Sequence, residues 1–185
     1  MEEVGDNMKN LLNTRHVILV IFMLFISCVT NYDWIPVSSA KYKINERSII
    51  FENNNLTIQV YGMYRSPSFD VITTEFRLSI LNKLEVIKID VGSSKLKILE
   101  LNENLVYNGY ETTAKTTDNN TIVISPDEKK KITLYYYSHN DSLLKSFPYD
   151  GPIKVALGIN IISDDNIKIE IPEFVFRTLA NEEEL

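Results

Sequence analysis

Apolar and polar residues alternate along most of the chain from residue 48 onward. The segment FDVITTEFRLSILN (residues 69–82) shows this most clearly: Phe76 and Leu78 fall on one face, and Glu75 and Arg77 fall on the other. A period of two is typical of a β-strand with one buried face. The same pattern predicts strands at residues 55–64, 85–91, 95–101, 120–125, 131–137, 153–161, 166–171 and 174–176.

Polar turn residues separate these segments, and no stretch beyond the N-terminal apolar run has a helical period. Many short strands at this spacing predict an all-β fold, a single antiparallel β-sandwich, with a small β-barrel as the alternative. The long strand 69–82, its polar break at Asn82 and Lys83, and the strand 85–91 resemble many immunoglobulin-like domains. The paired cysteines of antibody domains are missing, so this resemblance is to the general architecture.

Composition narrows the function classes. The 185 residues carry a net charge of −6, and their densest basic run is Lys129–Lys131. Nucleic-acid binding is not expected, because phosphate contacts need a concentrated positive face. The single cysteine excludes an internal disulfide, so burial alone must hold the fold together.

The N-terminus carries an apolar run that is short for a membrane helix. The strongly apolar part, Val17–Ile26, has 10 residues, and Lys9 and Arg15 precede it. A spanning helix needs about 20 apolar residues, whereas the core of a signal peptide needs about 7–15. We therefore expect a signal peptide over residues 1–27. Residues 1–7 carry acidic residues that do not suit a leader, so either Met8 is the true start or residues 1–7 are tolerated excess.

The residues LFISC (24–28) resemble the lipobox of bacterial lipoproteins, with Ser27 as the small residue before Cys28 and with Phe25 where that family usually has Leu. The resemblance implies that Cys28 is joined to diacylglycerol, that the leader is cleaved before it and that its new amine is acylated. It implies a bacterial cell-envelope location, with the domain outside the cytoplasm and the membrane as a partner through the lipid. An uncleaved anchor and ordinary secretion remain alternatives.

The rest of the chain is predicted to form one domain with two flanking segments. Residues 28–46 are expected to be a lipidated tether, since Pro36 and the serine pair at 38–39 argue against a helix. Trp34 and Tyr32 of this segment are expected to lie either at the lipid headgroups or against the domain. The sandwich is expected over residues 47–178 and a solvated acidic tail over 179–185.

The sequence contains few patterns that are typical of catalytic or metal-binding sites. His16 leaves with the leader, so His139 is the remaining histidine, and the sequence has no Gly-x-Ser-x-Gly motif. We expect no enzyme activity, no catalytic residue, no cofactor and no metal site. Two alternatives stay open: a carbohydrate-active or hydrolase-like sandwich whose acids the sequence does not identify, and a calcium site at Asp150, Asp164 and Asp165.

One tyrosine run suits recognition. On a strand Tyr135 and Tyr137 share one face and Tyr136 takes the other. The long connection 138–152 follows, and its apolar residues suggest a flap over one end of the sandwich. We expect a lipid-anchored envelope sandwich with a non-catalytic binding or structural role and an envelope protein or glycan as partner; the alternative is a single-pass accessory subunit of an envelope complex. The predicted binding surface comprises Tyr135, Tyr136, Tyr137, Leu143, Leu144 and Phe147.

Overall fold

The computed structural model describes residues 31–68, 71–112, 120–138 and 153–178. The chain divides into two compact units, Met1–Thr30 and Asn31–Leu185. The described residues all belong to the second unit. The predicted signal peptide with Cys28 and the predicted acidic tail lie outside the described residues.

The described part of the chain is built entirely from β-strands and their connections, and every strand pairing in it is antiparallel. The all-β antiparallel prediction is therefore confirmed. The strands are β1 (Asn31–Asp33), β2 (Ile35–Pro36), β3 (Lys43–Asn45), β4 (Ser48–Glu52), β5 (Leu56–Ser68), β6 (Val71–Asn82), β7 (Ile87–Ile98), β8 (Glu103–Thr112), β9 (Thr121–Ile124), β10 (Lys129–Ser138), β11 (Lys154–Ser163), β12 (Lys168–Ile169) and β13 (Phe174–Arg177).

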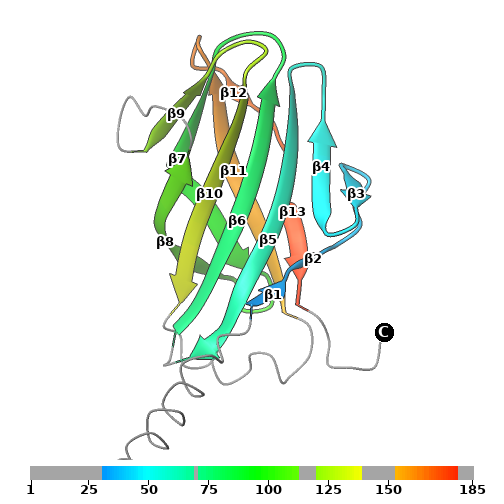
Figure 1. Ribbon diagram of the computed structural model, residues 1–185, viewed down its shortest axis with the longest axis vertical. Helices are drawn as coiled ribbons and strands as arrows, with labels where there is room; N and C mark the ends of the chain where they lie inside the picture. The colour runs from blue at the N-terminus through cyan, green and yellow to red at the C-terminus, as the bar shows by residue number, and fades with distance from the viewer. Residues whose placement is uncertain (1–30, 69–70, 113–119, 139–152, 179–185) are drawn as a thin grey trace, which may run out of the picture. The chain divides into compact units, whose positions relative to one another are not determined.

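The strands form two layers packed face to face (Figure 1). The first sheet has the order β3-β4-β5-β6-β10-β8, with β1 on the end of β5. The second sheet has the order β2-β13-β11-β7, with β9 on β7 and β12 on β11. β8 joins them, because Glu103–Leu105 pair with β7 while Val106–Thr112 pair with β10. The two sheets of the predicted sandwich are thus hydrogen-bonded into one continuous sheet along one side. The architecture is therefore close to a barrel, which was the alternative prediction.

The core lies between the two sheets and follows the period-two pattern. Along β6, for example, Phe76 and Ile80 are fully buried and Leu78 is 3% exposed, whereas Arg77 between them is exposed. Burying a side chain of this size contributes about 1.5–3 kcal/mol. The largest fully buried side chains are Trp34, Tyr136, Phe76, Phe174, Phe176, Ile49, Leu56, Ile58, Ile80 and Ile87.

The prediction of a tether over residues 28–46 is wrong for its described part. β1 pairs with β5 and β2 pairs with β13, so this segment adds a strand to each sheet. Trp34 between them is 1% exposed, and its Nε1 donates a hydrogen bond to Thr74 Oγ1 at 2.7 Å. Its ring centroid is 4.7 Å from that of Tyr64. Trp34 therefore packs in the core rather than at lipid headgroups, because a buried tryptophan removes a large apolar area from water.

Two predicted strands, 85–91 and 95–101, are one strand. β7 runs through Gly92–Ser94, where Asp90 faces Asn160 and Lys95 faces Gly158 of β11. Such a bulge shifts the side-chain alternation, so that the buried positions change phase between Val91 and Ser94. In the sequence this phase change has the same appearance as a turn. The strand β8, which connects the two sheets, was not predicted at all.

Candidate functional site

The tyrosine run occupies the end of β10 and divides between the two faces of the first sheet. Tyr136 is 1% exposed in the core, whereas Tyr135 and Tyr137 are half-buried. Tyr135 lies between Glu75 of β6 and Gly109 of β8. The ring of Tyr136 is therefore not available at the surface, which corrects its place in the predicted binding surface.

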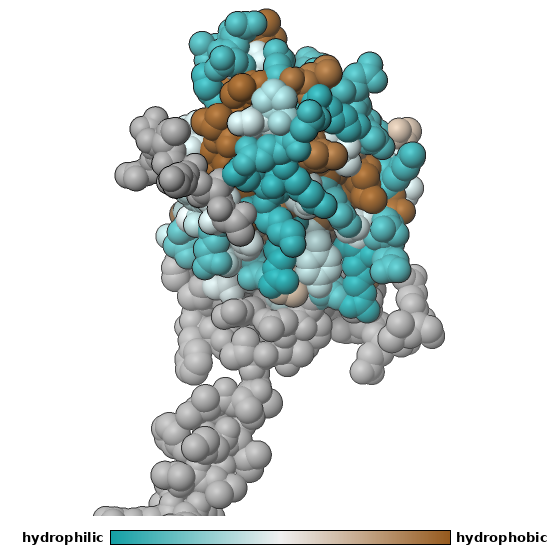
Figure 2. Space-filling model, turned by 45° about the horizontal axis from the view of Figure 1, so that its top comes forward, coloured by the Kyte–Doolittle hydropathy of each residue, from teal (hydrophilic) through white to brown (hydrophobic). Residues whose placement is uncertain are grey.

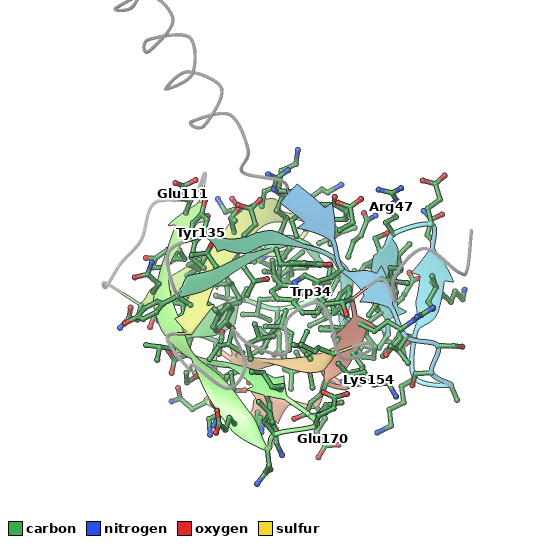
Figure 3. The ribbon with its side chains drawn as sticks, turned by 90° about the horizontal axis from the view of Figure 1, so that it is seen from below. Trp34, Arg47, Glu111, Tyr135, Lys154 and Glu170 are labelled. Carbon is green, nitrogen blue, oxygen red and sulfur yellow. The ribbon has the colours of Figure 1, made fainter. Side chains whose placement is uncertain are left out.

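A hollow of about 290 Å³ lies beside Tyr135. Met63, Glu75 and Tyr135 stand in one row across β5, β6 and β10, so their side chains project from the same outer face. The full lining is Met63, Tyr64, Thr73, Thr74, Glu75, Arg77, Asn108, Tyr135 and Tyr136. The outward projection of Tyr135 from β10, with Glu111 of β8 nearby, is visible in Figure 3.

An ion pair between a carboxylate and a guanidinium forms one wall of the hollow. Arg77 Nη2 lies 2.7 Å from Glu75 Oε1, and the two residues are two positions apart on the same face of β6. The Glu75 side chain is 18% exposed and the Arg77 side chain 57% exposed. The positive charge of Arg77 and the negative charge of Glu75 cancel. The guanidinium keeps further N–H donors, and the carboxylate keeps a second oxygen as an acceptor.

The phenol of Tyr135 stays protonated at neutral pH. Burial raises the pKa of Tyr135 above its usual value, and the neighbouring Glu111 carboxylate raises it further, whereas Arg77 lowers it. Its O–H donates to the Glu111 carboxylate, so the hydroxyl oxygen remains as an acceptor for a ligand.

A second group of hydroxyls lies beneath the sheet. Tyr107 and Tyr136 pack edge to face with ring centroids 5.9 Å apart. Burial raises the pKa of Tyr136 and raises that of Tyr107 to about 12. Within the described chain, neither hydroxyl nor the buried Ser94 Oγ has a hydrogen-bond partner with good geometry. These groups belong to the core, so we assign them no part in binding.

Exposed apolar residues near the loops after β6 and β11 form a less defined surface. Leu84 is 59% exposed and Ile167 is 66% exposed. Figure 2 shows apolar residues between hydrophilic ones on the end of the molecule that it brings forward. Nothing in the described structure indicates what would cover them, so the hollow is the stronger candidate.

The remaining predicted site residues can be placed only in part. Leu143, Leu144, Phe147, His139 and Cys28 lie outside the described residues, as does Asp150 of the alternative calcium site. Asp164 lies in the turn after β11 and its Oδ1 is 2.9 Å from Lys88 Nζ. The residues that the structure describes include no group of three or more His, Cys, Asp or Glu side chains placed to hold a metal ion.

Sequence reasoning did not single out the other walls of the hollow. Glu75 and Arg77 read as the solvent face of a strand, and Met63 and Asn108 carry no motif. They come together because of the register of β5, β6, β10 and β8. Strand register between distant segments has no local signal that would have identified these residues.

No family model matches the chain, and no curated protein matches it in sequence. Among solved structures, it is similar to an uncharacterised β-sandwich protein from Clostridium difficile at 12% identity and a TM-score of 0.43, covering 77% of this chain and 98% of the other. A protein from Archaeoglobus fulgidus has 13% identity, a TM-score of 0.44 and coverages of 66% and 95%. A proposed lipoprotein from Bacillus subtilis has 11% identity, a TM-score of 0.42 and coverages of 76% and 41%. Similarities of this size carry no inference about function.

No helix among the described residues is long and apolar enough to cross a membrane.

Proposed function

We propose that the mature protein is a lipid-anchored, non-catalytic β-sandwich of the bacterial cell envelope that binds its partner through the hollow beside Tyr135. The observation that carries the proposal is the segment LFISC at residues 24–28, at the end of an apolar run of signal-peptide length. Cys28 is the chain's sole cysteine and occupies the position at which a lipobox is acylated.

Lipidation at Cys28 would give stable attachment. Each buried methylene contributes about 0.8 kcal/mol, and a single acyl chain is only marginally sufficient, whereas two or more hold a protein permanently. A diacylglyceryl group with an acylated amine meets that requirement. Removal of residues 1–27 takes away two basic and three acidic residues and leaves a net charge of −5. This charge offers no electrostatic attraction to an anionic surface, so the lipid must supply the affinity.

The anchored sandwich would stay close to the lipid. Asn31, the first residue of β1, comes three positions after Cys28. A chain of that length spans at most about 11 Å. The proposal therefore replaces the expected long tether with a short link, and it limits the partners to molecules found near the membrane surface.

The chemistry of the hollow supports a binding role. It combines an aromatic ring with a paired carboxylate and guanidinium, and these groups can orient a ligand by contact and hydrogen bonding. Its location on the outer face of a continuous sheet fixes them on rigid elements, as a preorganised binding site requires.

Incorporation of radiolabelled palmitate into the wild type and into Cys28→Ala tests the anchor. We expect label in the wild type and none in the variant, with Ser38→Ala as a labelled control from the same segment. Mass spectrometry of the wild type should show a mature chain beginning at Cys28, and the uncleaved variant should show whether translation starts at Met8. A mature wild-type chain that retains residues before Cys28, or that carries no fatty acid, would refute the proposal.

A further inference from the structure

We propose that the hollow beside Tyr135 binds a neutral saccharide ring, an inference that rests on the binding role proposed above and names its ligand class. Four properties of the described residues support it: the size of the hollow, the arrangement of polar groups around one aromatic ring, the balance of charges, and the pairing of the strands beneath it.

The hollow has the dimensions of a small ligand. Its volume of about 290 Å³ lies at the lower limit of small-molecule pockets. It is formed by the outer face of three neighbouring strands, with Met63 on one side and Tyr135 on the other. Glu75 stands between them on β6, and the smaller side chain of Thr73, two residues before it on the same face, also lines the hollow. A single pyranose ring suits this shape better than an extended polymer does.

The polar groups match adjacent hydroxyls. Glu75 can accept hydrogen bonds through the oxygen that Arg77 does not occupy, and Arg77 retains N–H donors beyond the one directed at Glu75. Asn108 reaches the hollow from the bulge of β8 and carries both an amide donor and an acceptor. Such a set satisfies the donor and acceptor of each sugar hydroxyl, while the ring of Tyr135 offers an apolar surface for C–H groups.

The charges favour a neutral ligand. Glu75 and Arg77 form an ion pair, and the nearest further charge that acts on Tyr135 is the Glu111 carboxylate. Among the side chains that the structure describes at the hollow, there is no excess of positive charge to hold a phosphate or a carboxylate. A phosphorylated ligand would bring further negative charge beside the Glu75 and Glu111 carboxylates, and the single guanidinium of Arg77 would have to offset all of it.

The strands beneath the hollow cannot pair with a peptide. β5, β6 and β10 are each hydrogen-bonded to strands on both sides along the hollow. A peptide added as a further strand needs a free sheet edge. Recognition here must therefore use side chains, and this favours a compact polyhydroxyl ligand over an extended peptide.

The hollow lies near the anchored end of the domain. Met63 pairs with Asp33, which is five residues after Cys28 and hence at most about 18 Å of chain from it. The saccharide can thus come from two sources: a free envelope glycan or the headgroup of a glycolipid. The experiment below has an arm for each.

The test uses the lipidated full chain in a detergent without a sugar headgroup. Saturation-transfer NMR and calorimetry with glucose, galactose, mannose and N-acetylglucosamine form the free-sugar arm. In the second arm the lipidated chain is placed in bicelles that contain a glucosyl or galactosyl glycolipid, and saturation transfer to the sugar headgroup is measured, because the anchor alone would bring the chain into any bilayer. We expect binding of at least one probe at a Kd no weaker than about 10 mM. Tyr135→Leu should weaken it about tenfold, because the aromatic contact is lost.

Three matched variants make the result specific. Tyr135→Phe keeps the ring and should retain binding within a few-fold. Glu75→Gln should weaken binding at least as much as Tyr135→Leu, whereas Glu170→Gln, an exposed carboxylate on the second sheet, should not change it. Circular dichroism must show that each variant is folded.

Each outcome decides the proposal. Binding in either arm that depends on Tyr135 and Glu75 supports it and identifies the source of the sugar. Binding that neither variant alters places the saccharide elsewhere and overturns it, as does a failure of every probe in both arms. Palmitate labelling is independent of these results, so the lipid anchor can stand even where the saccharide site fails.

Discussion

Trp34 is the best place to test whether the N-terminal segment belongs to the sandwich. Its side chain is 1% exposed, its Nε1 donates to Thr74 Oγ1 at 2.7 Å, and it packs against Tyr64 and Phe76. We predict that Trp34→Ala strongly destabilises the protein. If residues 31–36 were a tether, the same substitution would have almost no effect on unfolding.

The expected loss follows from the structure. Truncation of a buried tryptophan to alanine costs about 3–5 kcal/mol. The lost hydrogen bond to Thr74 adds about 1 kcal/mol, so the total is about 4–6 kcal/mol. A domain of this size has a free energy of unfolding of about 5–15 kcal/mol. The variant should thus lose a large share of its stability, and Trp34→Phe, which keeps a ring and loses the N–H donor, should lose less.

Urea unfolding of the full chain in detergent, followed by circular dichroism, measures the effect. Lys41→Ala is the matched control, because it lies in the same segment and is exposed. Trp34 is the only tryptophan, so wild-type fluorescence gives a second reading: emission should be blue-shifted in the folded protein and shift to the red on unfolding. A Trp34→Ala loss below about 1 kcal/mol, no larger than that of an ordinary surface change, would refute the placement of this residue in the core.

Four further predictions concern stability. Gly62→Ala should cost about 1–3 kcal/mol in urea unfolding, because its methyl group would overlap the ring of Phe76; an unchanged midpoint would contradict that packing. Gly109→Ala should cost about 1–2 kcal/mol, since its φ of 132° is strained for any L side chain although space is available, and equal stability would show that the bulge relaxes. Tyr136→Phe removes an unpaired buried hydroxyl and should leave stability unchanged or raise it by about 1 kcal/mol, so a large loss would reveal a hidden partner. Because burial raises the pKa of Tyr136, and that of Tyr107 to about 12, the unfolded chain releases these protons first; wild-type stability should fall as the pH rises from about 10 toward 12, and less so in Tyr136→Phe.

The alternation of side chains allowed much of the fold to be predicted. β6 and β10 were located from period-two patterns alone, since a half-buried strand must alternate wherever it lies in the sheet. The same rule predicted that the side chain of Tyr136 points to the opposite face of the strand from those of Tyr135 and Tyr137. Where the chain bulges, as in β7 at Gly92–Ser94, the alternation breaks and the prediction failed.

Only part of the candidate site could be predicted from the sequence. Tyr135 stood out because three tyrosines in a row are unusual, but the other walls of the hollow come from three other strands. Their meeting depends on pairing partners such as Met63 with Glu75 and Glu75 with Tyr135. Pairing between segments distant in sequence is set by the packing of the whole sheet.

The sequence by itself determined most of the strand content, the antiparallel layers and the inward or outward direction of most side chains, because these follow from local alternation and turn chemistry. The tertiary structure alone decided that Trp34 enters the core, that β8 joins the two sheets, and that Glu75, Arg77 and Tyr135 share one hollow. The physical reason is that burial and register are properties of contacts between distant segments. A short strand such as β1 has too few residues to show a period of its own, and it forms only where a partner strand is already in place.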